Sequence, residues 1–150
     1  MNETNPQSLQ TRYWDDVSVG DEIDGFSLSL DWTTMVQQVN GSQDWNQVHH
    51  DPDYASDSGH DGVFYNTGWT AGLLGRALAE WAGLNGWVRK LSFQMREMNK
   101  NGDRIAVKGR VTEKEETATG EPLVYLDVWI ENDRVGKTSP AKGVIRLPKK

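Results

Sequence analysis

Hydrophobic and polar residues alternate through most of the second half of the chain, with the period of two that is typical of β-strands. Four such segments are separated by turn-forming sequences. These turns include an Asn-Gly pair in residues 99–103 and Asn132-Asp133. The segments are residues 87–95, 105–111, 123–130 and 135–147, the last of them interrupted near Pro140. This pattern predicts four strands that can pair as an antiparallel meander.

The first half of the chain has a different pattern. Residues 22–30 alternate as one more strand, with a kink at Gly25. Apolar residues then return with helical spacing at Trp32, Met35, Val36 and Val39. This spacing predicts a helix that begins after a cap at Asp31 or Thr33 and ends at Asn40-Gly41, and Pro52 is expected to open a second, short helical turn.

Residues 67–82 have the strongest helical pattern, and Gly83 is the predicted stop. One broad apolar face comprises Trp69, Leu73, Leu74, Ala77, Leu78 and Trp81, and a second stripe of small residues comprises Gly68, Gly72, Gly75 and Ala79. Each glycine inside a helix costs about 0.5–1 kcal/mol relative to alanine, so the stripe predicts that another backbone approaches this helix closely. Strands that follow one long helix predict an α+β domain in which a central helix packs on a curved antiparallel sheet.

Length and composition fit one domain of this kind. The chain has 150 residues, of which we expect residues 1–11 to form a flexible arm and residues 12–150 the domain. The absence of cysteine excludes disulfides, thiolate-bound metals and thiol nucleophiles. No apolar run approaches the about 18 residues of a membrane helix, and the N-terminus has no secretory-signal pattern, so a cytoplasmic protein without membrane contacts is expected.

Charge is unevenly distributed along the chain. Residues 1–75 contain one cation and twelve acids, which gives −11, whereas residues 76–150 contain fifteen cations and ten acids, which gives +5. A net charge of −6 argues against a nucleic-acid partner, because phosphate backbones require a dense basic surface. The basic second half is compatible with a local patch for a small polyanion or with ordinary solvated charge.

The three histidines of the chain, His49, His50 and His60, all lie in a polar, turn-rich stretch of residues 42–62. A long irregular stretch inside a compact domain is often functional. Nucleophilic catalysis has little support, because the chain has no cysteine and no Gly-x-Ser-x-Gly sequence. No metal site is expected either, because adjacent residues such as His49 and His50 point apart and no second cluster of ligands is evident.

Asp44 and His49 are the best candidates for chemistry in this stretch. They are five residues apart, with Asn46 between them, and a turn of this length can bring a carboxylate and an imidazole to one water molecule. Such a pair can add or remove water, because one group takes a proton while the other returns one. Alternatively, Asp44 caps a turn and His49 packs against it.

The segment DWNQVHHDPDY, residues 44–54, resembles the hydratase motif of the MaoC-like, or (R)-specific enoyl-CoA hydratase, family. The family motif Asp-x-Asn-x-x-His-x-Asp-Pro is matched at Asp44, Asn46, His49, Asp51 and Pro52, and YWDDVSVGDEI (13–23) is similar to the family's opening. The resemblance covers nearly the whole chain and implies a hot-dog fold, in which an antiparallel sheet wraps around a long helix. More narrowly, the chain is similar to one subunit of actinobacterial heteromeric hydratases that act on steroid side-chain enoyl-CoA.

The resemblance also implies roles for individual residues. Asp44 and His49 occupy the positions of the catalytic pair, and Asn46 that of an Asn that supports the loop. The family continues with Pro-Ile-x-His-Gly, whose glycine N–H serves as the oxyanion donor, and here Asn66 stands in place of the His and Thr67 in place of the Gly. We therefore expect the N–H of Thr67 or Gly68 to polarise a thioester carbonyl.

The activity implied is reversible hydration of a trans-2-enoyl-CoA to a 3-hydroxyacyl-CoA, without a metal or other cofactor. Cations around the strand after the long helix are candidates for the CoA phosphates, although a solvated strand edge is the alternative: Arg89, Lys90, Arg96 and Lys100. Trp45, Tyr65 and Trp69 either line an acyl tunnel or belong to the core.

Two other functions fit the same fold. One is a non-catalytic subunit that shapes the acyl pocket of a heteromeric hydratase. The other is a thioesterase, for which Glu80 is the only acid on the long helix. Because a hot-dog sheet has an exposed edge, a homodimer or higher oligomer is expected, and a heteromer is possible.

Overall fold

Six strands form one antiparallel sheet in the computed structural model, which describes residues 10–23 and 25–150. They are β1 (Glu22–Ile23), β2 (Ser27–Ser29), β3 (Trp87–Phe93), β4 (Arg104–Glu116), β5 (Pro122–Asn132) and β6 (Gly136–Arg146). The strand order is β1-β4-β5-β6-β3, and β2 also pairs with β4. The predicted α+β architecture of a helix on an antiparallel sheet is confirmed.

The predicted meander is correct for β4, β5 and β6 but wrong for β3, which pairs with β6 instead of β4. The turn after β3 makes no hairpin between β3 and β4, because it is fastened to the segment that precedes the long helix. The N–H of Tyr65 donates to the carbonyl of Asn99 (2.9 Å), and Phe64 forms an isolated β-bridge with Lys100. The last strand also continues through Pro140, which pairs with Trp129, and the irregular register lies between Ile130 and Glu131 instead.

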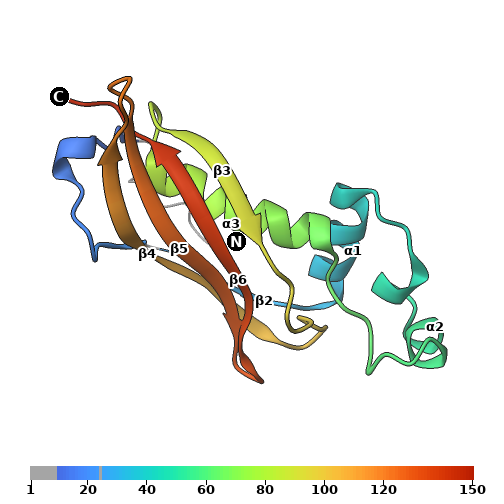
Figure 1. Ribbon diagram of the computed structural model, residues 1–150. Coiled ribbons are helices and arrows are strands. Elements are labelled where there is room, and N and C mark those ends of the chain that lie inside the picture. The colour runs from blue at the N-terminus through green and yellow to red at the C-terminus, as the bar shows by residue number, and fades with distance from the viewer. Residues whose placement is uncertain (1–9, 24) are drawn as a thin grey trace.

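Among the described residues, three helices accompany the sheet, and only the longest lies on its face. They are α1 (Trp32–Ser42), α2 (Pro52–Asp57) and α3 (Thr67–Ala82), with short 3₁₀ turns η2 (Trp14–Asp16) and η3 (Gln47–His49). Figure 1 shows α3 running along one face of the curved sheet, with α1 and α2 gathered beside the start of α3, beyond the sheet. No helix within the described ranges is both long and apolar enough to span a lipid bilayer.

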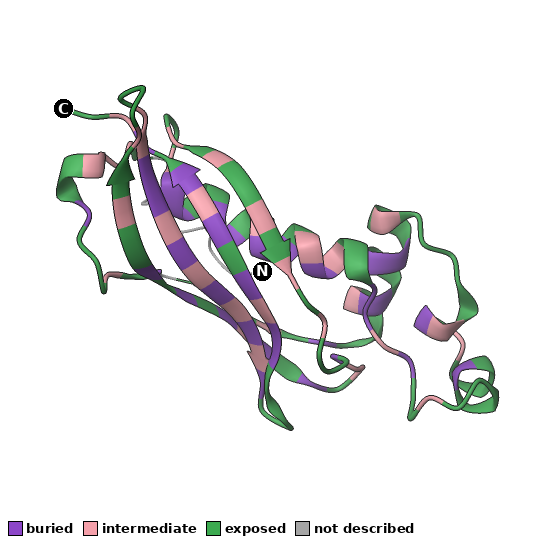
Figure 2. Ribbon diagram, viewed as in Figure 1, coloured by how far each residue is buried: buried purple, intermediate pink, exposed green. Residues whose placement is uncertain are grey.

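The hydrophobic core lies between α3 and the sheet. Leu74 and Leu78 of α3 are fully buried, as are Ile130 and Ile145 of the facing strands, and the purple bands in Figure 2 mark such alternating positions. Each fully buried leucine or isoleucine contributes about 1.5–3 kcal/mol. Helix and sheet approach closely at Gly143, where an added Cβ would lie 2.7 Å from a methyl carbon of Leu78. The core therefore fixes where α3 lies on the sheet.

Two predicted helical stripes are only partly buried. A Cβ added at Gly72 or Gly75 would meet nothing within 4 Å, so the expected close backbone approach along α3 is wrong for these positions. On α1, Val39 is buried but Trp32 and Val36 are 49% and 63% exposed. The reason is that α1 and the start of α3 lie beyond the sheet, where this chain covers only one side of each helix.

The ends of the elements follow the predicted signals. Asp31 caps α1 by accepting a hydrogen bond from the N–H of Thr34 (2.8 Å), and α3 ends at Gly83 with φ of 73°.

The strand predicted over residues 22–30 is divided into β1 and β2. At Gly25 between them, an added Cβ would lie 1.7 Å from the carbonyl oxygen of Val107. Most of the predicted N-terminal arm lies outside the described residues.

Candidate active site

Asp44 and His49 are brought together by the polar turn that follows α1. The Asp44 Oδ2 atom lies 3.2 Å from His49 Nε2. Asn46 shapes this turn, because its side chain caps η3 by accepting from the N–H of Val48 (3.2 Å), while the N–H of Asn46 donates to Asp44 Oδ1 (3.3 Å). The turn that could place a carboxylate beside an imidazole does so in the structure.

The other ring nitrogen of His49 is held by the main chain. Nδ1 lies 2.8 Å from the carbonyl oxygen of Phe64, which can only accept a hydrogen bond, so Nδ1 carries the proton. Nε2 is therefore the atom that can accept or release a proton toward Asp44. Asp44 Oδ2 and His49 Nε2 thus lie side by side, 3.2 Å apart, where both can bond to one water molecule beside them.

The two members of the pair differ in exposure. His49 is buried, with 6% of its surface accessible, and its ring meets the Phe64 ring edge-on with 4.9 Å between centroids. The side chain of Asp44 is 46% exposed. The imidazole is therefore held rigidly from behind while its carboxylate side is open to water or a ligand.

Helix α3 begins next to this pair, and Asn66 is its N-cap. The side-chain oxygen of Asn66 accepts from the N–H of Trp69 (2.8 Å), and its carbonyl oxygen accepts from Thr70 N–H (3.1 Å). Within the described residues, the N–H groups of Thr67 and Gly68 donate to no protein acceptor. These two groups, at the positive end of the helix dipole, form a ready site for a negatively charged oxygen.

A half-buried hydroxyl that the sequence did not single out links the polar turn to the start of α3. Ser42 Oγ accepts from the side-chain amide of Asn66 (2.6 Å) and donates to the carbonyl of Gln38 (2.6 Å). The N–H of Asp44 points at the same oxygen (3.4 Å), and the N–H of Asn66 donates to the Gln38 side chain (3.3 Å). A serine at the end of a helix is too common for its spacing to have identified this role.

A hollow of about 350 Å³ lies between α1 and α3, beside the start of α3. Its wall is made by Ser42, Gly68, Trp69, Gly72, Leu73 and Arg76, together with Gln37, Gln38 and Gly41 of α1. The small residues of the α3 stripe therefore leave room for a ligand at Gly68 and Gly72.

The three aromatic residues predicted near the site are placed differently. Trp69 lines the hollow between α1 and α3. Tyr65 is fully buried behind Trp69, with 4.1 Å between ring centroids, and burial raises the pKa of its phenol, so this group stays protonated. Trp45 is 59% exposed and lines neither the hollow nor the second groove, described below.

The four candidate cations for phosphate groups are also scattered. Arg89 pairs with Glu121 (3.2 Å), and Lys100 pairs with Asp61 (2.7 Å). Lys90 is exposed on β3. Arg96 alone among the four lines a groove, and that groove lies on the face of the sheet away from α3.

No protein-family model and no curated protein matches the sequence. Solved structures do match the fold, among them one chain of the ChsH1–ChsH2 complex from Mycobacterium tuberculosis, with a TM-score of 0.79 and 24% identity over 87% of this chain and 98% of that one. The chain has the hot-dog fold. The (R)-hydratase PhaJ1 from Pseudomonas aeruginosa matches this hot-dog domain with a TM-score of 0.81 and 19% identity, covering 95% of this chain and 89% of that one.

A MaoC-like dehydratase from Rhodospirillum rubrum has the same hot-dog fold, with a TM-score of 0.78 and 17% identity over 93% of this chain and 98% of that one. The fold expected from the resemblance is thus confirmed over nearly the whole length of each chain. Hydrogen bonds to Ser42 Oγ from the N–H of Asp44 (3.4 Å) and the side chain of Asn66 (2.6 Å) join the polar turn to the start of α3 in this hot-dog domain.

Proposed function

We propose that this hot-dog domain is a hydratase that adds water reversibly to a trans-2-enoyl-CoA to give a 3-hydroxyacyl-CoA. The observation that carries the proposal is the Asp44–His49 contact of 3.2 Å, with the imidazole fixed by the Phe64 carbonyl and the carboxylate open to solvent. Solved hot-dog structures that match the chain include (R)-hydratases and MaoC-like dehydratases, which supports the same choice.

The proposed reaction needs a base, an acid and a site for negative charge. Asp44 and His49 bind one water molecule, whose hydroxyl oxygen bonds to the β-carbon while a proton is delivered to the α-carbon, so that the pair ends with as many protons as it began with. The thioester oxygen accepts from the N–H groups of Thr67 and Gly68 as the enolate forms. One donor of this kind contributes about 3–4 kcal/mol to lowering the barrier.

Substitution of the pair tests the activity. Loss of the enoyl absorbance is followed for a panel of enoyl-CoA chain lengths with wild type, Asp44→Asn and His49→Ala, and His50→Ala serves as the control because His50 is exposed beside the pair. We expect both site variants to lose about 10²–10⁴-fold in kcat and the control to keep its activity. Fully active Asp44→Asn and His49→Ala proteins would refute the site.

The acyl chain is proposed to lie in the hollow between α1 and α3, since Gly68, one of the two proposed oxyanion donors, lines this hollow. Gly72→Leu should fill the hollow and lower kcat/KM for long acyl chains more than for short ones. Gly75→Leu is the matched control, because Gly75 lies on the same helix but does not line the hollow. An unchanged chain-length profile in Gly72→Leu would place the acyl chain elsewhere.

Release of CoA in the same assays would indicate a thioesterase instead. Its candidate carboxylate, Glu80, pairs with Arg76 on the helix surface (2.8 Å) and does not line the hollow. The geometry therefore favours the hydratase.

The assembled state is proposed to be a homodimer at least. The edge of the sheet formed by β3 pairs with β6 on one side, and on its other side it has no partner strand among residues 10–23 and 25–150. An open edge of this kind favours pairing with another chain. Native mass spectrometry that finds only monomers would contradict the dimer, and purified protein that is inactive until a second protein is added would indicate a heteromer.

A further inference from the structure

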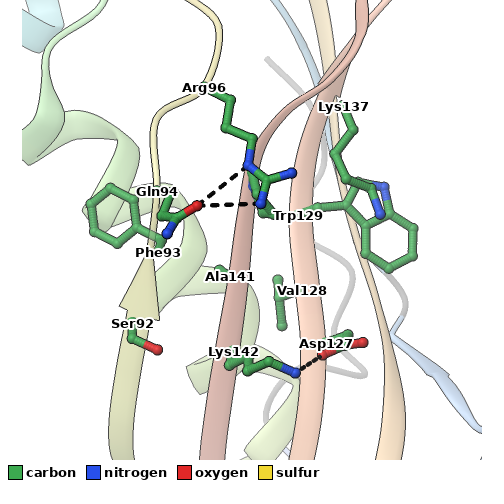
Figure 3. Close-up of a pocket in the computed structure, with 11 residues that line it drawn as sticks. Ser92, Phe93, Gln94, Arg96, Asp127, Val128, Trp129, Lys137, Ala141 and Lys142 are labelled. Atoms are coloured by element: carbon green, nitrogen blue, oxygen red, sulfur yellow. Dashed lines mark hydrogen bonds and ion pairs between the residues drawn. The ribbon is translucent and has the colours of Figure 1, made fainter.

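A second groove lies on the face of the sheet that is opposite α3. It encloses about 420 Å³ above β5, β6 and the residues that follow β3. Gly143 of β6 faces Leu78 of α3, so Lys142 beside it faces away, as do its neighbour Asp127 and the next outward pair, Trp129 and Pro140. Figure 3 shows Asp127, Trp129 and Lys142 together with Arg96 and Lys137.

Positive charge in this groove exceeds negative charge. Arg96, Lys137 and Lys142 line it, and Asp127 is the one acid in its lining. Asp127 pairs with Lys142 (3.0 Å), which leaves two cations without a carboxylate partner within the described chain. The overall charge of the protein is −6, so this excess is local.

The two remaining cations make no direct ion pair with any described residue, and Glu131, which lies opposite Lys137 in the strand pairing, is itself paired with Lys108 (2.6 Å). The guanidinium of Arg96 donates to the neutral Gln94 side chain from two nitrogens, each at 3.3 Å. The ammonium of Lys137 lies 4.1 Å from the centre of the Trp129 ring. A phosphate would be a stronger partner for both groups than an amide oxygen or a ring face.

The groove is also close to the proposed active site. Met95 lies between two groove residues, Gln94 and Arg96, and its sulfur accepts a hydrogen bond from Thr67 Oγ1 (3.3 Å) at the first residue of α3. This segment is fastened to β6, since the N–H groups of Gln94 and Arg96 donate to Pro140 and Thr138 (3.0 and 2.9 Å). Only the segment of residues 94–96 therefore separates the start of α3, where the thioester is proposed to bind, from the groove.

We propose that this outer groove binds the phosphorylated nucleotide end of the CoA thioester, an assignment that rests on the proposed function. Arg96 and Lys137 contact the phosphates, with Lys142 at the edge of the groove. When Lys137 moves from the Trp129 ring to a phosphate, the indole is exposed for stacking of the adenine base. The basic second half of the chain was compatible with a patch for a small polyanion. In this proposal, Arg96, Lys137 and Lys142 form that patch.

Calorimetric titration of the full-length protein tests binding without requiring activity. The probes are CoA and 3′-phosphoadenosine 5′-diphosphate, and the variants are Arg96→Gln and Lys137→Gln. Each should weaken binding of both probes about tenfold. Arg146→Gln is the matched control, because Arg146 is an exposed cation of β6 outside the groove, and its affinity should be that of wild type. Equal affinities in all four proteins would overturn the site.

Kinetics distinguish the nucleotide end of the substrate from a free nucleotide. KM for an enoyl-CoA should rise about tenfold in Arg96→Gln and Lys137→Gln, whereas KM for the corresponding enoyl-pantetheine, which lacks the nucleotide, should stay at the wild-type value. Weaker nucleotide binding with an unchanged KM for enoyl-CoA would overturn the assignment to CoA. Groove-dependent binding without any hydration would leave the groove standing and would refute the hydratase instead.

Discussion

The body formed by α3 and the sheet and the polar segment of residues 42–66 are held together by different interactions. In the body, fully buried apolar side chains such as Leu74, Leu78 and Ile145 meet between the helix and the strands. In the polar segment, Val63 and Tyr65 also enter the core, but single hydrogen bonds fix the residues around His49, including those of Asn46, Ser42 and the Phe64 carbonyl. The body determines where the site lies, and the polar segment determines its geometry.

This difference separates stability from activity. Apolar burial is additive over many residues, so one lost side chain lowers the free energy of unfolding but leaves the site intact in molecules that remain folded. A hydrogen bond in the polar segment holds one particular group, so its loss changes the position of that group. Four predictions test this comparison.

The largest effect on stability is expected for Leu78→Ala. It removes a fully buried side chain that packs against Gly143, and the free energy of unfolding should fall by about 2–5 kcal/mol. Urea denaturation measures this change. The control, Leu84→Ala, removes a side chain that is 68% exposed and should have little effect. If kcat per folded molecule also collapsed in Leu78→Ala, the proposed separation of roles would be wrong.

A smaller loss of stability, combined with a loss of activity, is expected for Ser42→Ala. The buried amide of Asn66 loses its acceptor, which costs about 1–3 kcal/mol, and kcat/KM for an enoyl-CoA should fall about tenfold. Ser139→Ala is the matched control, because Ser139 is fully buried and its hydroxyl makes no hydrogen bond within the described residues. Equal activities of the two variants would remove Ser42 from the site.

For Asp103→Asn, we expect the loss of stability relative to wild type to change only at acid pH. Burial alone would raise the pKa of this carboxyl, but hydrogen bonds from Arg134 and the N–H of Lys100 outweigh it and hold the pKa below its usual value. Its contribution to stability is therefore complete above about pH 4 and is lost as the pH falls through the lowered value. In urea titrations, the difference between wild type and Asp103→Asn should shrink on acidification below about pH 4, and a constant difference would contradict this.

The smallest effect, and one of opposite sign, is expected for Gly75→Ala. An added Cβ meets nothing within 4 Å, and alanine is favoured over glycine inside a helix by about 0.5–1 kcal/mol. Thermal unfolding should therefore show a modest stabilisation. If Gly75→Ala weakens an oligomer instead, another copy of the chain covers this side of α3.

The sequence predicted the body better than its connections. The helix over residues 67–82 has the predicted bounds, because its apolar spacing, its cap and the terminal Gly83 agree. The pairing of β3 with β6 could not be predicted, because alternation along a strand reveals its faces and not its neighbours. The open glycine positions of α3 were misread for a related reason, since a small side chain can leave space for a backbone or for a ligand.

For the site, the motif was sufficient to choose Asp44 and His49, and their contact agrees with the turn expected between them. The proton on Nδ1 could not be anticipated, because its acceptor at Phe64 is fifteen residues further along the chain. Ser42 and Gln38 were missed for the same reason, since each acts through a contact with Asn66 that only the folded chain creates.

The acceptor that fixes His49 is a main-chain carbonyl, and this has a consequence for how the protein can change. A substitution at position 64 replaces the ring that meets His49 edge-on but leaves the carbonyl in place, so the hydrogen bond to Nδ1 is insulated from drift at that position. Evolution or an engineer can thus change the ring that packs against the histidine while keeping the hydrogen bond that fixes its tautomer.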